Sequence, residues 1–225
     1  MQPPIGLPLS THRLTFAAEH AMRLPEHLGS TWRGVFGHAL KRSVCIQRLR
    51  PCPGCPIERA CLYPAVFETG PGPDARKMRR YERVPHPYVL VPDGWGRPAL
   101  AAGETLDLFL VLVGRSAAHV AYLLHALMRA AQEGIGPDRG SLQLAAVAAV
   151  EGPWPEAAVQ GEGVTAEARP VPTALPAGRC RLTLATPLRL KRDGQLVGPD
   201  PLLAASLLMS LVRRVAMLTA FHAEP

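Results

Sequence analysis

A histidine and two cations in the segment 29–45 form the group with the clearest potential for catalysis. Lys41 follows His38 by three residues and Arg42 follows it by four, so all three side chains can point the same way from a helix. A histidine can serve as general acid or base in RNA strand cleavage, and neighbouring cations can stabilise the charge on a pentavalent phosphate. The alternative is a solvated basic helix face that carries an incidental histidine.

Four cysteines with the spacing of metal ligands begin at the last residue of this segment. They are Cys45, Cys52, Cys55 and Cys61, in the pattern C-x6-C-x2-C-x5-C. C-x2-C is the usual half-site for a metal ion, and four thiolates suit tetrahedral zinc in a structural role. An iron–sulfur cluster takes the same ligands, and reduced cysteines without metal are a third alternative. Cys180 stands apart on a predicted strand, where we expect it in the core.

Other basic and glycine-rich segments could contact a polyanion. The turn GIGPDRG at 134–140 can bring backbone close to phosphates, although a plain helix-to-strand connection would use the same residues. His86 and Tyr88 lie in VPHPYVL, where they could stack on a base or pack inside the fold. The residues that we predict to contact RNA are Arg33, Arg48, Arg50, Arg79, Arg80, Gly134, Gly136 and Arg139.

The charge distribution favours a polyanionic partner as well. The formal net charge is +7, and residues 98–225 hold equal numbers of acidic and basic side chains, so the whole excess lies in residues 1–97. A one-sided basic balance is typical of nucleic-acid binding, and a compositional bias is the alternative. Hydrophobic residues make up 48% of the chain, which is enough for a core and excludes a mostly disordered protein.

No segment predicts export or insertion into a membrane. The N-terminal sequence MQPPIGLPLS lacks the basic start and the apolar stretch of a signal peptide. The longest strongly apolar run, 202–212, is shorter than the roughly 20 residues that span a bilayer, and Arg213 and Arg214 close it. We therefore expect a cytoplasmic protein.

Hydrophobic periodicity predicts the elements that position these residues. We expect strands at 7–18, 105–113, 141–150 and 179–192, and helices at 29–45, 117–133 and 201–221, the last two capped by Ser116 and Asp200. The first helix should bury Trp32, Val35, Phe36, Ala39, Leu40 and Val44, and the second Val120, Leu123, Leu124, Leu127 and Ala131. Residues 46–97 should form an irregular insertion with short strands near 62–68 and 86–91, and 151–178 a linker.

Five motifs in this order resemble a known family. They are LGSTWRGVFGHALKRSVC, the cysteine pattern with YPAVFE, VPHPYVL, EGIGPDRGSLQL, and LTLATPLRLKRDGQLV followed by an Arg-Arg helix. Together they resemble the bacterial CRISPR-associated precursor-crRNA processing endoribonucleases of the RAMP superfamily, over nearly the whole chain. The resemblance implies an α+β fold of tandem ferredoxin-like (RRM-like) modules, each with the order βαββαβ. The first would occupy 1–150 with the Cys-rich insertion at about 45–97, and the second would begin at 179–225 after the linker.

The resemblance also implies metal-independent cleavage of CRISPR repeat RNA. In that chemistry a 2′-OH attacks the adjacent phosphate, which leaves a 2′,3′-cyclic phosphate and a 5′-OH. In several members a histidine on or near the first helix acts as acid or base, and His38 matches that position. Lys41 or Arg42 would then stabilise the transition state, zinc at the cysteines would be structural, and catalysis would need no cofactor. RNA and other CRISPR-associated subunits would be the partners.

The chain departs from the family in its last part. Members continue beyond the Arg-Arg helix with further strands, a helix and a glycine-rich loop, whereas this sequence stops at Pro225. We expect either a fragment, or a module completed by another chain, or a lost activity. The helix at 201–221 should then expose apolar surface, which predicts aggregation or a partner.

Two other functions fit the same residues. A non-catalytic RAMP subunit of an effector complex would hold guide RNA tightly and in a salt-sensitive way without cutting it. A metal-stabilised scaffold module would carry a basic face that binds nothing. Cleavage, RNA affinity and metal content measured together separate the three.

Overall fold

The computed structural model describes residues 7–47, 51–68, 84–150, 184, 188–192, 195–198 and 202–223. Its elements are, in chain order, β1 (Leu9–Ala18), β2 (Met22–Arg23), α1 (Leu28–Val44), α2 (Leu62–Phe67), β3 (Tyr88–Pro92), β4 (Ala99–Leu100), β5 (Thr105–Val113), the 3-10 helix η1 (Gly114–His119), α3 (Val120–Glu133), β6 (Leu142–Val150), β7 (Lys191–Arg192), β8 (Gln195–Leu196) and α4 (Ala204–His222). The predicted linker at 151–178 and most of the predicted strand at 179–192 lie outside the described residues.

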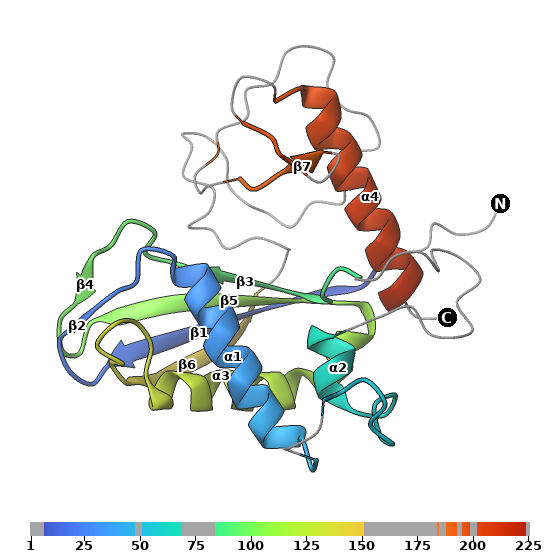
Figure 1. Ribbon diagram of the computed structural model, residues 1–225. Helices are drawn as coiled ribbons and strands as arrows, with labels where there is room; N and C mark the ends of the chain where they lie inside the picture. The colour runs from blue at the N-terminus through green and yellow to red at the C-terminus, as the bar shows by residue number, and fades with distance from the viewer. Residues whose placement is uncertain are drawn as a thin grey trace.

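Four strands form one antiparallel sheet in the order β3-β5-β1-β6. The connection through α1 joins β1 to β3 across β5, and the connection through α3 joins β5 to β6 across β1. Both helices lie side by side against the same face of the sheet (Figure 1). The protein is therefore an α+β protein whose topology is compatible with a ferredoxin-like fold.

The core lies between this sheet face and the two helices. Alternate residues of β1 and β5 point into it, and they face each other in register, as Leu14 does Leu108 and Phe16 does Leu106. From α1 the fully buried side chains include Trp32 and Phe36. The predicted inward faces of the first two helices are confirmed, since every residue named for them is buried or packs against this core.

One predicted strand is wrong. Residues 62–67 form the short helix α2, which packs on α1. Pro64 lies in its first turn, where a backbone N–H has no partner within the helix, so the ring costs no hydrogen bond. The other short strand, predicted near 86–91, is confirmed as β3, but it belongs to the main sheet rather than to an insertion.

The predicted cap at Ser116 is also wrong. Its hydroxyl accepts a hydrogen bond from the Val113 N–H at 3.1 Å and donates one to the Pro87 carbonyl at 2.9 Å. Ser116 thus lies inside η1, and the regular helix begins at Val120. Because Pro87 precedes β3 and Val113 ends β5, this buried hydroxyl connects the beginning of β3 to the end of the neighbouring antiparallel strand β5.

The last helix is anchored at its C-terminal end. The Arg115 guanidinium donates to the Phe221 carbonyl at 2.8 Å, and the His222 Nε2 lies 2.8 Å from the Pro85 carbonyl. The helix begins at Ala204 after Leu203. Asp200, the predicted cap, lies outside the described residues.

The rest of α4 exposes apolar side chains. The sequence predicted such an exposed apolar surface for the helix at 201–221, and this prediction is confirmed. They are Leu208, Met209, Leu211, Val212 and Val215, each more than half exposed. Among the described helices α4 alone is long and apolar enough to cross a membrane, although the apolar run by itself was expected to be too short. Length and composition are a weak indication, because core helices of soluble proteins meet the same criteria. Arg213 and Arg214 lie within this helix, where charges would be costly in hydrocarbon.

Acid should loosen the anchor of α4. Burial lowers the pKa of His222, with a smaller effect of Arg115 in the same direction, and burial also lowers the pKa of the nearby His86. The unfolded chain therefore takes up these protons first, so stability present at neutral pH falls as the pH drops below the ordinary value of 6.5. His222→Gln keeps a donor for the Pro85 carbonyl but does not titrate. We expect its urea midpoint to fall less than that of the wild type between about pH 8 and about pH 5, and equal slopes would contradict this.

Candidate active site

His38 lies at a shallow depression between α1 and α2. The side chains and glycines that line it are Ser30, Arg33, Gly34, Gly37 and His38 from α1, and Tyr63 and Phe67 from α2. Its volume is about 350 Å³, and it is widely open to solvent. The imidazole of His38 is exposed, so a large substrate could reach it.

The two predicted partners of His38 turn to opposite sides of α1. The Lys41 Nζ lies 4.9 Å from the centroid of the Tyr63 ring, toward α2. Arg42 forms an ion pair with Glu133 of α3, a carboxylate that also lies 3.5 Å from Arg129. Positions three and four residues along a helix flank the starting residue on two sides, which is why the pair diverges. Arg42 is thus engaged by a carboxylate that it shares with Arg129, and its guanidinium is turned toward α3.

A second histidine fixes an arginine at this depression. The His86 Nδ1 lies 3.0 Å from the Val66 carbonyl, which can only accept, so Nδ1 carries the proton. The His86 Nε2 is then an acceptor, and the Arg33 guanidinium donates to it at 2.5 Å. Burial and then the charge of Arg33 lower the pKa of His86, which is consistent with this neutral form. Arg33 is therefore a cation held in place by a neutral imidazole.

Aromatic packing holds α2 against α1 and β3. Phe67 lies 5.3 Å from Phe36 and 5.2 Å from Tyr88 between ring centroids, and 6.0 Å from His86. Burial raises the pKa of Tyr88 to about 12, against the smaller opposing effect of Arg33. His86 and Tyr88 therefore pack inside the fold, which is the second of the two roles predicted for them, and their ring faces are not free to stack on a base.

The two glycines of α1 have different roles. A Cβ at Gly37 would lie 2.9 Å from the Phe67 ring, so this glycine makes room for α2 rather than for a ligand. A Cβ at Gly34 would meet nothing within 4 Å, and this position stays open at the depression.

The predicted metal ligands are all described, and the four thiols are free. Cys52 is buried, and burial followed by a hydrogen bond with Glu68 raises its pKa to about 11, with Cys45 close enough to contribute. Among the described residues no three His, Cys, Asp or Glu side chains are arranged to hold one metal ion. The thiols as placed here do not form a tetrahedral site, and a zinc ion would have to draw them together, so zinc stays a prediction. Elemental analysis of the purified protein tests it: one zinc per chain that Cys52→Ser removes and Cys180→Ser keeps is the expected result.

The predicted glycine-rich turn has a local structural role. Gly134 and Gly136 have φ angles of +98° and +76°, and a Cβ at Gly136 would lie 2.8 Å from the Arg23 carbonyl. The side chain of Arg23 forms an ion pair with Asp138 of the turn at 2.5 Å, which lowers the pKa of Asp138 to about 2. Gly136 therefore approaches β2, and Gly134 approaches the backbone of Arg139 within the same turn. Arg139 is exposed on the same turn.

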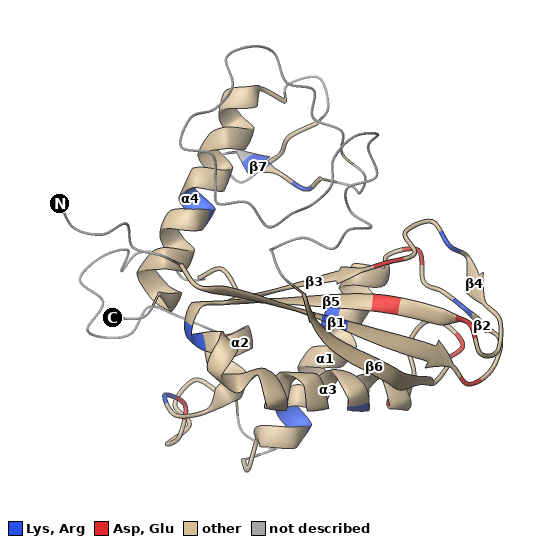
Figure 2. Cartoon of the chain, turned by 180° about the vertical axis from the view of Figure 1, so that it is seen from behind, with Lys and Arg blue, Asp and Glu red and all other residues tan. Residues whose placement is uncertain are grey.

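The remaining predicted RNA contacts, Arg48, Arg50, Arg79 and Arg80, lie outside the described residues. The described Lys and Arg side chains are spread over several elements, among them α1, α4 and the edge formed by β2 and β4 (Figure 2). The excess of positive charge in residues 1–97 therefore does not by itself mark one binding surface.

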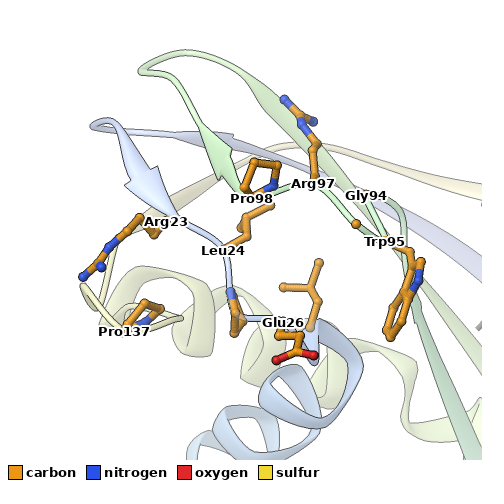
Figure 3. A pocket seen from close by; sticks show the side chains of 11 residues that line it. Arg23, Leu24, Glu26, Gly94, Trp95, Arg97, Pro98 and Pro137 are labelled. Carbon is orange, nitrogen blue, oxygen red and sulfur yellow. The ribbon is translucent and has the colours of Figure 1, made fainter. Parts of the chain in front are cut away.

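A second pocket was missed by the sequence analysis. It lies between the segment that leads into α1, the turn between β3 and β4, and the glycine-rich turn at Pro137 (Figure 3). Trp95 stands at its side and is 47% exposed. A tryptophan between two glycines in the polar turn DGWGRP is the signal that could have found it, since large aromatic residues in such turns have no core to enter.

Comparison with known proteins places the chain in a family. It is 31% identical over 115 residues to an uncharacterized protein of Archaeoglobus fulgidus, a match that covers 51% of this chain and 37% of the relative. The chain thus matches well under half of the length of that relative. The model of the family AF_1859_N, described as an N-terminal domain, matches residues 7–170, which is most of the chain and includes the whole four-stranded sheet and the His38 depression. The chain therefore belongs to the AF_1859_N family of N-terminal domains.

Proposed function

We propose that this chain is a RAMP-type module of a CRISPR-associated endoribonuclease that cleaves repeat RNA without a metal ion. The observation that carries the proposal is the exposed His38 at a depression where His86 fixes the Arg33 guanidinium. Two further findings support it: the strand order β3-β5-β1-β6 with two helices on one face, and a helix α1 that ends in basic residues. The five sequence motifs supply the link to this family.

The depression suggests a division of roles. His38 would take the proton of the 2′-OH as that oxygen attacks the phosphorus, or return a proton to the 5′-oxygen as its bond to phosphorus breaks. Arg33 would stabilise the extra negative charge on the phosphate, because a fixed cation needs no reorganisation during the reaction. Lys41 can assist from the α2 side, whereas Arg42 is already paired with Glu133. Arg33 thus takes the role that the sequence suggested for Arg42.

The proposal has corollaries for location and partners. The protein would work in the cytoplasm with precursor crRNA as substrate and other CRISPR-associated subunits as partners. A metal at the cysteines would be structural, because no step of the transesterification passes through it.

Two observations favour the alternative of a guide-RNA-binding subunit without activity. The pair of Arg42 with Glu133 removes one cation from the site, and the exposed depression does little to exclude water from the reaction. Such a subunit would bind RNA through the same face and release no product.

Incubation with CRISPR repeat RNA in EDTA tests the proposal. We expect one major cut, with a 2′,3′-cyclic phosphate on the upstream product and a 5′-OH on the downstream product. Salt-sensitive binding without product would favour the alternative. Failure to bind RNA at about 50 mM salt, where phosphate contacts are strong, would contradict both.

A further inference from the structure

The second pocket, away from His38, is built from three segments of the described chain. Its lining residues are Arg23, Leu24, Pro25, Glu26, Leu28, Gly94, Trp95, Gly96, Arg97, Pro98 and Pro137, around a volume of about 460 Å³. In Figure 3 Trp95 stands on one side and Arg23 with Pro137 on the other, with Glu26 between them. Apolar and proline side chains form most of the wall.

Trp95 presents an aromatic surface held by a tight turn. The Gly94 N–H donates to the Asp93 carboxylate at 2.7 Å, and the Arg97 N–H donates to the Gly94 carbonyl at 2.9 Å. The His27 ring lies nearly parallel to the indole, at an angle of 18° and a centroid distance of 6.4 Å. Trp32, by contrast, is fully buried in the core. The fold therefore keeps the Trp95 indole at the surface, on a tight turn and beside the His27 ring.

The arginines at the pocket are already paired. Arg23 is paired with Asp138 at 2.5 Å. Arg97 is paired with Glu104 at 3.1 Å and donates to the Thr105 carbonyl. Glu26 is exposed and forms no ion pair within the described part of the chain. The pocket thus combines an aromatic face with one unneutralised carboxylate, which can only accept hydrogen bonds.

We propose that this pocket binds an amino-bearing nucleobase of single-stranded RNA, stacked on Trp95 with its exocyclic amino group donating to Glu26. Every base offers a flat face to an indole, and stacking of this kind contributes about 5- to 100-fold to affinity. Carboxylates accept from the amino group of cytosine, and adenine and guanine carry such groups too, whereas uracil does not. The inference rests on the proposed function in one respect, namely that the protein binds RNA. It adds a contact remote from the cut and a preference among bases.

Binding of labelled oligonucleotides of a single base tests the inference. We expect wild-type protein to bind oligo(rC) and oligo(rA) more tightly than oligo(rU). Trp95→Ala should weaken binding of all three by about 5- to 100-fold, while Trp95→Phe keeps most of the affinity. Glu26→Ala should remove the preference for amino-bearing bases and leave oligo(rU) unchanged. Unaltered circular dichroism shows that these surface variants fold.

The outcomes separate this inference from the proposed function. If the wild type binds and cleaves repeat RNA but Trp95→Ala binds as tightly, the pocket is not an RNA contact and the proposed function stands. If the wild type binds no RNA, the proposed function itself fails. A cationic side chain of a protein partner would meet the same indole and carboxylate through a cation–π contact. Binding of an arginine-rich peptide that Trp95→Ala abolishes, with RNA affinity unchanged, would therefore overturn the inference.

Discussion

Replacement of His38 by alanine should slow the cleavage of repeat RNA by about 100- to 10,000-fold, the usual contribution of a general acid or base. Among the residues that line the depression, His38 carries the imidazole, the side chain that most often serves as general acid or base. Its removal leaves in place the Arg33 guanidinium, which we propose to contact the phosphate, so binding of RNA should change little. Single-turnover cleavage at saturating protein measures the chemical step without a contribution from affinity.

A matched control is available on the neighbouring helix. His125 is exposed on α3, and His125→Ala removes the same group at another place on the surface. We expect it to cleave like the wild type. If His38→Ala also cleaves like the wild type, His38 is an incidental residue on a basic helix face, and the proposed mechanism is wrong even where RNA is cut.

Replacement of Phe36 by alanine should lower the free energy of unfolding by about 3–5 kcal/mol, as is typical for a fully buried phenylalanine. Phe36 is 0% exposed, and its ring contacts Tyr88 of β3 edge-on at 5.4 Å as well as Phe67 of α2. The substitution therefore leaves a cavity where α1, α2 and the sheet meet. Urea denaturation followed by circular dichroism measures the loss.

Gly34→Ala is the control for this effect in the same helix. Its new methyl group would meet nothing within 4 Å, and alanine favours a helix over glycine by about 0.5–1 kcal/mol. We expect this variant to be as stable as the wild type or more so. A loss below about 1 kcal/mol for Phe36→Ala would mean that this ring contributes little to the packing of α1 and α2 on the sheet.

The predictions for His38→Ala and Phe36→Ala concern different properties, activity and stability, so each can be tested separately. His38 is exposed, so His38→Ala should alter stability by less than about 0.5 kcal/mol while it removes activity. Phe36→Ala should lower the stability and leave the rate of cleavage unchanged under conditions where the variant remains folded. Loss of both properties in the His38 variant would indicate a structural role for that residue.

The placement of elements in this protein follows from local patterns wherever those patterns are long. Both helices of the sheet module and three of its four strands were predicted nearly to their observed bounds, because period 3.6 and continuous apolar runs leave little ambiguity over nine or more residues. The six residues of α2 were too short for periodicity to decide, and contact with the surface left free by Gly37 made them a helix. The cap at Ser116 was misplaced for a related reason: a hydroxyl before an apolar run marks a helix start only if tertiary contacts, here those with Val113 and Pro87, do not use it first.

The available chemistry could be predicted from the sequence: a histidine and cations on one helix, four cysteines in a chelating pattern, and an apolar last helix. Which of these groups meet depends on how the elements pack. In the folded chain Lys41 lies against Tyr63 and Arg42 pairs with Glu133. His86, which is distant in sequence, contacts Arg33. The physical reason is that periodicity predicts the face of a helix on which a side chain lies, whereas its partners come from whatever segment packs against that face.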